Sequence, residues 1–457
     1  MSEVKGHQGG GSSSSDGNGG GSLLGLARDT LGRFGLQDEN GEVSWWVSSA
    51  LQATTVLFWF GVGSGLVLAR SKLRASKTRA QRTAQDAQAK ETAAQEASQE
   101  AALAAADQLY QTFGGMLTSA TLYVGDQLGL YEELRLAGPI TSAQLAARTG
   151  LHERWLHEWL LQNASAKILR YDRKTCAFSM VPGYDIALTD PNCAGMFQMG
   201  PALVSRIAAL KHIMQDPAGL GETYDGSFKD DIAMSIERMH TSTFKTAIPD
   251  GLFMSHHVID GNLPKLLGKG GMRVAEIGCG TATGLVELAR RFPQAEFHGF
   301  ELSSEAISQA QNRISRARVK NATIHDVRET PIEANSFDFC FCHDVVHDCA
   351  QPEPLIRDAF RGLRPGGTFL IVDIRTFSDD ADIVTDPASA VRLGFSCGLC
   401  LHSSSSEKDG ARLGTLGLKD GVISKYLSDA GFENFQSFTC EALPTNSCFT
   451  ARKPDSS

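Results

Sequence analysis

The stretch Met272–Pro293, MRVAEIGCGTATGLVELARRFP, decides the fold. Its first part, VAEI, is a short apolar run typical of a buried strand, and the segment LVELARRF further on has helical spacing. Between them lie three glycines, Gly278, Gly280 and Gly284. A strand, a glycine-rich loop and a helix in this order predict the opening of an α/β nucleotide-binding sheet.

The spacing of these glycines narrows the class of ligand. The dinucleotide-binding fingerprint is G-x-G-x-x-G, whereas here the third glycine comes one residue later. An acidic residue, Glu276, stands two positions before the first glycine. The loop lacks the lysine of a P-loop, which disfavours a site that cradles phosphates.

Four further strands are predicted downstream, at residues 295–303, 322–327, 337–348 and 363–374. Because helical segments separate them, the pattern predicts a parallel sheet whose ligands lie beyond the carboxyl ends of the strands. Acidic residues and a histidine fall at those predicted ends, namely Glu276, Glu301, Asp326 and His347.

A second pattern precedes the sheet. Residues 141–172 read as helix, turn, helix and strand, the order of a winged helix-turn-helix, and Thr141 or Ser142 could cap the first helix. A helix that reads DNA presents polar and basic side chains. The second helix instead offers Trp155, Leu156, Trp159 and Leu160, which favours packing or dimerisation.

The remaining chain divides by composition. Residues 1–42 form a Gly/Ser-rich tail, and residues 43–69 carry no charge over 27 positions, enough for a helix to cross a bilayer. Lysines and arginines follow, so the sequence predicts a membrane anchor with the C-terminal side, which carries the rest of the protein, facing the cytosol. A targeting segment and a buried helix are alternatives. We expect a helical stalk at 70–108, the winged-helix domain at 109–190, a helical connector that contributes to a ligand pocket at 191–268, and the sheet domain at 269–457.

Composition excludes some partners. The net charge is −9, which argues against nucleic acid as a partner. The ten cysteines are scattered, as expected of reduced thiols in a reducing compartment.

Residues 270–375 resemble the class I S-adenosylmethionine-dependent methyltransferases in the loop from Glu276 to Gly284, in Glu301 and in the turn LRPGG. The winged-helix segment is similar to that of small-molecule O-methyltransferases of the plant caffeic-acid type. The fold implied is a Rossmann-like methyltransferase sheet, of class α/β, preceded by a helical winged-helix domain. The cofactor implied is S-adenosyl-L-methionine, and a homodimer through the winged-helix region is expected.

The resemblance also implies roles for residues. In the plant enzymes a His-Asp-Trp after the fourth strand supplies the general base; His347 and Asp348 match it, but Cys349 replaces the Trp and the following acidic pair is missing. We therefore predict His347 as the base, with Asp344 or Asp348 orienting it. Acceptor contacts are predicted at Tyr224, Met239 and His240. The cofactor-binding residues predicted are Glu276, Gly278, Gly280, Thr281, Gly284, Glu301, Leu302, Asp326, Val327 and His343.

Metal binding is the competing reading of the same segment. His343 and His347 are four apart and could share a helix face, and Cys397, Cys400 and His402 resemble part of a zinc site. No second pair stands at a suitable spacing, so no metal site is predicted.

The sequence thus predicts methyl transfer to a small-molecule acceptor, with a hydroxyl favoured. A thioether acceptor such as 4-methylthio-2-hydroxybutyrate, on the way to dimethylsulfoniopropionate, is the alternative. A winged-helix regulator that binds S-adenosylmethionine and an inactive membrane scaffold are hypotheses of other classes.

Overall fold

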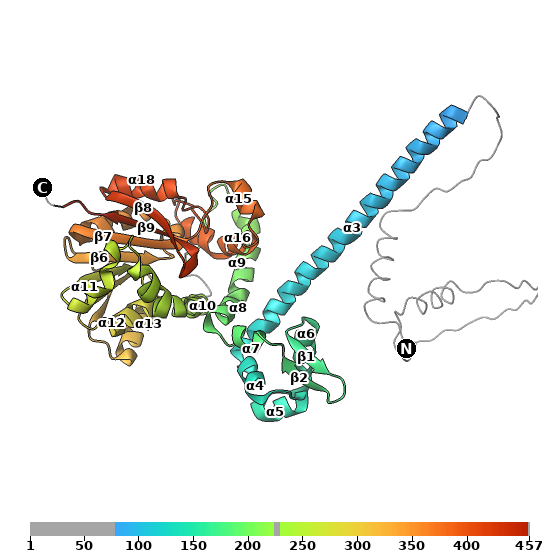
Figure 1. The fold of residues 1–457 in the computed structure, drawn as a ribbon, viewed down its shortest axis with the longest axis horizontal. Coiled ribbons are helices and arrows are strands. Elements are labelled where there is room, and N and C mark those ends of the chain that lie inside the picture. Colours follow the sequence, from blue (N-terminus) through green and yellow to red (C-terminus); the bar gives the residue numbers. More distant parts are fainter. Residues whose placement is uncertain (1–77, 224–228, 456–457) are drawn as a thin grey trace, which may run out of the picture. The chain divides into compact units, whose positions relative to one another are not determined.

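A computed structural model describes residues 78–223 and 229–455 (Figure 1). The chain divides into two compact units, residues 1–99 and 100–457. The described part of the first unit is helical throughout and belongs to α3 (Thr78–Gln127). The predicted tail (1–42) and the segment 43–69 lie outside the described residues. The predicted stalk is helical from residue 78, and the helix continues beyond residue 108 to Gln127.

The winged helix-turn-helix predicted from residues 141–172 is present. Thr141 caps its first helix in a capping box, in which the Thr141 hydroxyl accepts from the Gln144 N–H and the Gln144 side chain accepts from the Thr141 N–H. In its second helix Leu156, Trp159 and Leu160 are buried and pack within the domain, whereas Trp155 is 76% exposed. The elements are α4 (Leu130–Ala137), α5 (Ser142–Thr149), α6 (Glu153–Ser165), β1 (Leu169–Asp172), β2 (Ala177–Met180) and α7 (Tyr184–Ala187).

A run of helices connects this region to the sheet. It consists of α8 (Pro191–Gln198), α9 (Gly200–Ile213), α10 (Lys229–Ser242), the π-helix η1 (Thr243–Gly251), the 3₁₀ turns η2 (Leu252–Met254) and η3 (Ile259–Gly261), and α11 (Leu263–Lys269). Helix α10 packs along α8 and also contacts α12, so it reaches the helix that follows the glycine-rich loop.

The sheet has seven strands in the order β5-β4-β3-β6-β7-β9-β8. The pairs from β5 through β7 are parallel, and β9 runs antiparallel to both of its neighbours. The predicted five strands are β3 (Arg273–Ile277), β4 (Glu296–Glu301), β5 (Ala322–Asp326), β6 (Phe337–His343) and β7 (Leu363–Ile374). The sequence did not predict β8 (Glu433–Cys440) and β9 (Leu443–Arg452).

Helices cover both faces of the sheet, with α11 to α13 on one side and α18 on the other (Figure 1). Because side chains alternate along a strand, Phe339 and Phe341 of β6 enter the core beneath α12, while Cys340 and Cys342 enter the core beneath α14 and α18. The covering helices are α12 (Thr283–Arg291), α13 (Ser304–Ala317), α14 (Pro352–Gly362) and α18 (Asp420–Ala430). Shorter elements are η4 (Val346–Asp348), α15 (Asp380–Thr385), α16 (Ser389–Phe395), η5 (Ser396–Cys400) and α17 (Leu401–Ser404).

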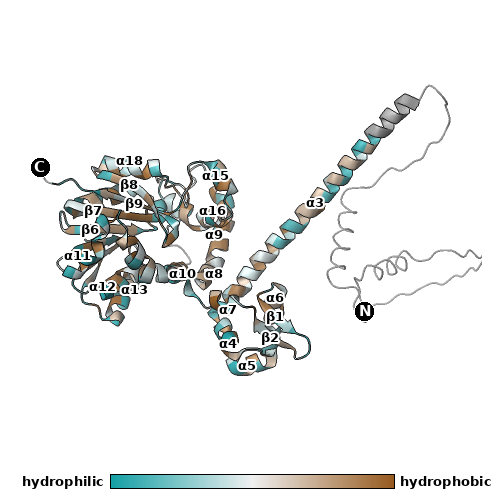
Figure 2. Cartoon of the chain, in the orientation of Figure 1, coloured by the Kyte–Doolittle hydropathy of each residue, from teal (hydrophilic) through white to brown (hydrophobic). Residues whose placement is uncertain are grey.

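The structure contradicts the prediction of a membrane-anchored protein with its catalytic part on the cytosolic side. Among residues 78–223 and 229–455, no helix is long and apolar enough to cross a membrane. Helix α3 has the length but alternates hydrophilic and hydrophobic residues along its course (Figure 2). The segment 43–69, on which the prediction rested, lies outside the described residues. The described residues therefore give no support for a membrane as a partner.

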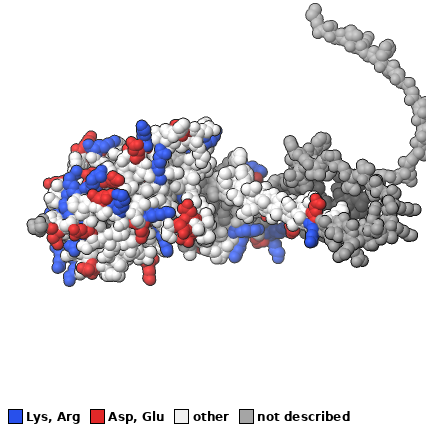
Figure 3. Space-filling view, turned by 90° about the horizontal axis from the view of Figure 1, so that it is seen from above, with Lys and Arg blue, Asp and Glu red and all other residues white. Residues whose placement is uncertain are grey.

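Charged side chains of both signs are interspersed over the described surface that Figure 3 shows. On that face the lysines and arginines do not gather into one basic patch. Hydrophobic residues concentrate in the strands of the sheet (Figure 2), where the cores described above lie.

Candidate active site

The glycine-rich loop leaves the carboxyl end of β3 beside the carboxyl end of β6. Gly278 has a φ of 70°, and a Cβ placed there would lie 2.6 Å from a methyl group of Val345. Gly280 has a φ of 52°, and a Cβ there would meet no described atom within 4 Å. Gly278 is therefore required by the protein's own packing, whereas the space beside Gly280 is open to a ligand.

Gly284 serves the fold differently from the other two glycines. A Cβ at this position would lie 2.4 Å from the ring of Phe244 in η1. The third glycine thus permits close packing of α12 against the connector, in agreement with the buried position of both residues.

Glu276 is the buried acid of this loop. The residue is 3% exposed, and its Oε2 has no hydrogen-bond partner among the described residues. Burial, with a smaller contribution from the charge of Glu301, raises the pKa of Glu276 to about 8. A buried carboxyl group without a partner is suited to receive a cationic group of a ligand, such as the ammonium of S-adenosylmethionine.

Glu301, at the end of β4, bonds three backbone groups. Its Oε2 accepts from the Gly280 N–H at 2.8 Å, and its Oε1 accepts from the N–H groups of Leu302 and Ser303 at 2.8 and 2.9 Å. A carboxylate oxygen accepts about two hydrogen bonds, so Oε2 retains capacity for a ribose hydroxyl. Leu302 itself is 57% exposed beside this carboxylate.

Asp326 ends the neighbouring strand, β5, directly opposite Glu301. Both of its oxygens accept from the guanidinium of Arg328, at 2.6 and 2.9 Å, and hydrogen bonds from this group hold the pKa of Asp326 below its usual value. Val327 follows, half-buried, and its N–H donates to the Glu301 carbonyl. The structure thus gathers the predicted cofactor residues of β4 and β5 at one edge.

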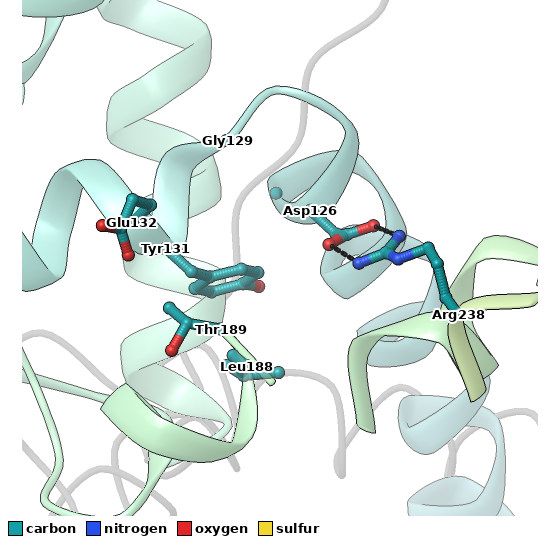
Figure 4. Close-up of a pocket in the computed structure, with 8 residues that line it drawn as sticks. Asp126, Gly129, Tyr131, Glu132, Leu188, Thr189 and Arg238 are labelled. Atoms are coloured by element: carbon teal, nitrogen blue, oxygen red, sulfur yellow. Dashed lines mark hydrogen bonds and ion pairs between the residues drawn. The ribbon is translucent and has the colours of Figure 1, made fainter. Parts of the chain in front are cut away.

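Helix α10 contacts the glycine-rich loop through a side-chain hydrogen bond. Glu237 accepts from the Thr281 hydroxyl at 3.1 Å and forms an ion pair with Arg313 of α13. Arg313 in turn donates to the Thr281 carbonyl at 2.9 Å. The next residue, Arg238, turns to the winged-helix region and forms a bidentate ion pair with Asp126 (Figure 4).

This ion pair borders a cavity of about 270 Å³. Its lining comes from the end of α3, from α4 and from the segment after α7 as well as from α10 (Figure 4). Arg238 also donates to Gln198 of α8 at 2.9 Å. One arginine therefore joins the winged-helix region to the connector, one residue away from the contact with the cofactor loop.

His347 lies in η4, just beyond the end of β6, and is 3% exposed. Its Nδ1 stands 2.5 Å from Oδ1 of Asp373, a fully buried residue of β7. The second oxygen of Asp373 accepts from the backbone N–H groups of Val346 and His347. Asp373 thus fixes both the ring and the backbone of His347. The sequence analysis did not select it, although a lone acid in the apolar run FLIVDI was a signal for a partner.

Asp348 and Cys400 lie on the other side of the imidazole. Nε2 of His347 is 3.3 Å from Oδ1 of Asp348, and the Cys400 thiol interacts with the same ring. Burial disfavours the imidazolium, but the carboxylates of Asp348 and Asp373 outweigh it and raise the pKa of His347 well above its usual value.

Asp344 is placed away from the role predicted for it. Its Oδ2 lies 3.2 Å from Nε2 of His240, and its Oδ1 accepts from the Asn446 amide at 2.8 Å. Burial opposes its ionisation, but the charges of His343 and His240 outweigh this and hold the pKa of Asp344 below its usual value. Burial lowers the pKa of His343 to about 4.

The three predicted acceptor contacts have different outcomes. Tyr224 lies outside the described residues. Met239 packs against Gly195 of α8 and against an apolar cluster that includes Cys400. His240 reaches Asp344, as described above. The structure therefore brings His240 to the end of β6, whereas Met239 packs against α8 and the cluster that includes Cys400.

Comparison with known proteins agrees with this geometry. Residues 268–414 match a family described as a methyltransferase domain, and residues 116–190 match the Rv2258c-like winged HTH domain. The chain therefore contains a methyltransferase domain. The buried acid Glu276 and the open space at Gly280 are compatible with S-adenosylmethionine, the cofactor expected from the sequence.

Individual relatives match parts of this chain. The fatty-acid O-methyltransferase of Mycolicibacterium smegmatis is 32% identical over 105 residues, which is 23% of this chain and 38% of that protein. The mitomycin 7-O-methyltransferase MmcR has a similar structure (TM-score 0.57, 16% identity, 77% of this chain and 99% of that one). So does human N-acetylserotonin methyltransferase in complex with SAM (TM-score 0.54, 18% identity, 77% and 98%). At these identities the structures show a shared fold. The chain spans less than half the length of the curated relatives it matches first.

Proposed function

We propose that this protein transfers a methyl group from S-adenosylmethionine to a hydroxyl group of a small molecule, with His347 as the general base. The observation that carries the proposal is the 2.5 Å contact between His347 Nδ1 and Asp373 Oδ1 at the carboxyl end of the sheet. A histidine held this way keeps its Nδ1 proton on the side of the carboxylate, so Nε2, which lies 3.3 Å from Asp348 Oδ1, is the nitrogen that would take a proton from an acceptor once the ring is neutral.

The cofactor supplies an activated methyl group on a sulfonium, so the protein's task is to hold the acceptor in line and to remove its proton. Glu276 would bind the ammonium of the cofactor and Glu301 its ribose, with Asp326 and Val327 at the adenine. As the acceptor oxygen forms its bond to the methyl carbon, its proton passes to Nε2 of His347. Asp348 and Asp373 stabilise the imidazolium that results.

The surroundings of His347 favour an acceptor with an apolar body. Cys400, whose thiol interacts with the His347 ring, belongs to an apolar cluster with Met199, Ala202, Ile232 and Leu399. Met239 packs against the same cluster. We propose that this cluster holds the apolar part of the acceptor while His347 faces its hydroxyl.

The division of labour along the chain follows from this proposal. Residues 269–457 would form the catalytic domain, residues 191–268 would complete the acceptor pocket, and residues 109–190 would form the winged-helix domain. The contacts of α10 with Thr281 and with Asp126 support a connector that serves both sides.

The test is turnover on a panel of phenols, hydroxy acids and thioethers, followed as S-adenosylhomocysteine release by the full chain. His347→Ala is measured beside His152→Ala, an exposed histidine of the winged-helix region that serves as the matched control. Loss of a general base lowers the rate about 10²–10⁴-fold. We expect that loss on a hydroxyl acceptor in His347→Ala alone.

Two outcomes would contradict the proposal. Turnover on a thioether that survives His347→Ala would move the acceptor atom to sulfur, since a thioether has no proton to remove. Binding of S-adenosylmethionine without turnover on any acceptor would favour a protein that senses the cofactor.

A further inference from the structure

Three side chains that could bind a cation meet at the end of β6. His343 is the last residue of that strand, Asp344 follows it, and His240 comes from the last turn of α10. Their ligand atoms all lie within 4.8 Å of one another. His240 Nε2 is 3.2 Å from Asp344 Oδ2, and His343 Nδ1 is 3.7 Å from the same oxygen.

His343 is buried, with a side chain that is 2% exposed, and its ring nitrogens lack hydrogen bonds within the described residues. A buried polar group left without a hydrogen bond costs about 1–3 kcal/mol. The ring is held by the aromatic rings of His240 and Phe244, at centroid distances of 4.6 and 5.1 Å, so its nitrogens stay within the cluster.

Asp344 is oriented as a ligand would be. The Asn446 amide occupies its Oδ1 at 2.8 Å, and this contact leaves Oδ2 facing the two imidazoles. Carboxylates that bind metals are commonly held by such outer hydrogen bonds. Ligands about 2.0–2.1 Å from a tetrahedral ion stand about 3.3 Å apart, close to the two separations observed.

We propose that His240, His343 and Asp344 form a binding site for a divalent ion of the zinc type. Two imidazoles and one carboxylate suit Zn²⁺ and its transition-metal neighbours, whereas Mg²⁺ prefers oxygen ligands. Three protein ligands leave a further coordination position for water or for an oxygen atom of an acceptor. His240 is 24% exposed at its side chain, so the site opens on that side. The proposal does not depend on the acceptor or on methyl transfer.

The test uses the full chain after chelator treatment, titrated with Co²⁺ as a spectroscopic probe and then with competing Zn²⁺. We expect a single equivalent of Co²⁺ to bind with the visible spectrum of a tetrahedral nitrogen and oxygen site, and Zn²⁺ to displace it. Asn446→Ala removes the outer hydrogen bond and should weaken binding by about 10–100-fold. His240→Gln removes a ligand from a partly exposed position and should weaken it more.

The matched control addresses the other nearby cluster that could hold an ion, His347, Asp348 and Cys400. Cys400→Ser should leave the Co²⁺ spectrum and affinity unchanged. Binding that persists in His240→Gln and is lost in Cys400→Ser would overturn the proposal, as would a chain that binds neither Co²⁺ nor Zn²⁺. His343→Leu separates a metal ligand from a purely structural histidine. Without metal, the variant should be more stable than the original protein, and it should no longer bind Co²⁺.

Discussion

Nδ1 of His347 and Oδ1 of Asp373 lie 2.5 Å apart, although 26 residues and one helix separate them along the chain. The two residues lie at the ends of adjacent parallel strands, or just beyond, so the sheet itself sets their distance. The pair therefore has the rigidity that proton transfer at a fixed position requires.

Asp373→Asn should lower kcat by about 10²–10⁴-fold, because the ring of His347 loses the acceptor that holds its Nδ1 proton. Asp338→Asn is the control at the other end of β6, where Asp338 bonds the Arg273 N–H and the Arg364 guanidinium. Both variants lose a carboxylate of the same sheet, so denaturation curves measure the shared structural cost. Equal effects of the two variants on kcat would contradict the role of Asp373.

The pH profile should show a rate that rises with pH above neutrality. The pKa of His347 is raised above its usual value, and a base must lose its proton before it can accept one. Asp348→Asn removes one of the charges that raise this pKa, so the rising limb of kcat/KM should move to lower pH. A limb that stays in place, or moves to higher pH, would show that Asp348 does not tune His347.

Glu276→Gln should change how stability depends on pH. The pKa of Glu276 is about 8 in the folded protein against an ordinary value of 4.5, so between these two pH values the folded protein binds one more proton than the unfolded chain. This group alone therefore lowers the free energy of unfolding as pH rises from 4.5 to 8, by up to about 1.4 kcal/mol per pH unit.

Without cofactor, the variant should gain stability over the original protein as pH rises through that window, and the difference should level off above it. The same variant should bind S-adenosylmethionine more weakly in calorimetric titration, since the cofactor's ammonium loses its carboxylate. A stability difference that does not vary with pH would contradict the raised pKa of the buried Glu276 carboxyl group.

Two glycines of the loop should separate packing from binding. Gly278→Ala places a methyl group 2.6 Å from Val345 at a positive φ, and should destabilise the protein by about 2–4 kcal/mol. The added methyl group of Gly280→Ala meets no described atom within 4 Å. Only the positive φ should therefore lower the free energy of unfolding, by about 1–2 kcal/mol. Cofactor affinity should nevertheless fall more in Gly280→Ala among folded molecules. A stronger loss of affinity in Gly278→Ala would contradict this assignment.

Local signals explain which parts of the fold the sequence could predict. The strand, loop and helix of Met272–Pro293 lie close together in sequence, and β6 and β7 carry the apolar runs FCFC and FLIV. The sequence did not predict β8 because this strand lies at the sheet edge and is mostly exposed, without the regular alternation of a half-buried strand. The same locality narrowed the helix cap to Thr141 or Ser142, and the structure has Thr141 as the cap.

The candidate site was harder to predict because its contacts are distant in sequence. His347 was selected by its motif, but its partner Asp373 comes from the next strand, and Asp344 turns toward His240, more than a hundred residues earlier. Spacing along the chain suggested His343 with His347, whereas the structure joins His343 to His240. These groups come together only in three dimensions, where the last turn of α10 contacts the end of β6.

The last full turn of α10 has a consequence for attempts to redesign this protein. Four consecutive residues, Glu237 to His240, contact the cofactor loop, the winged-helix region, α8 and the end of β6 in turn. Substitutions of Met239 or His240, made to change acceptor preference, would also shift the neighbouring residues of this turn. The contacts of that turn with Thr281 and Asp126 would then change. Selection for a new acceptor should therefore recover compensating substitutions in α3 or in the glycine-rich loop, far from the acceptor itself.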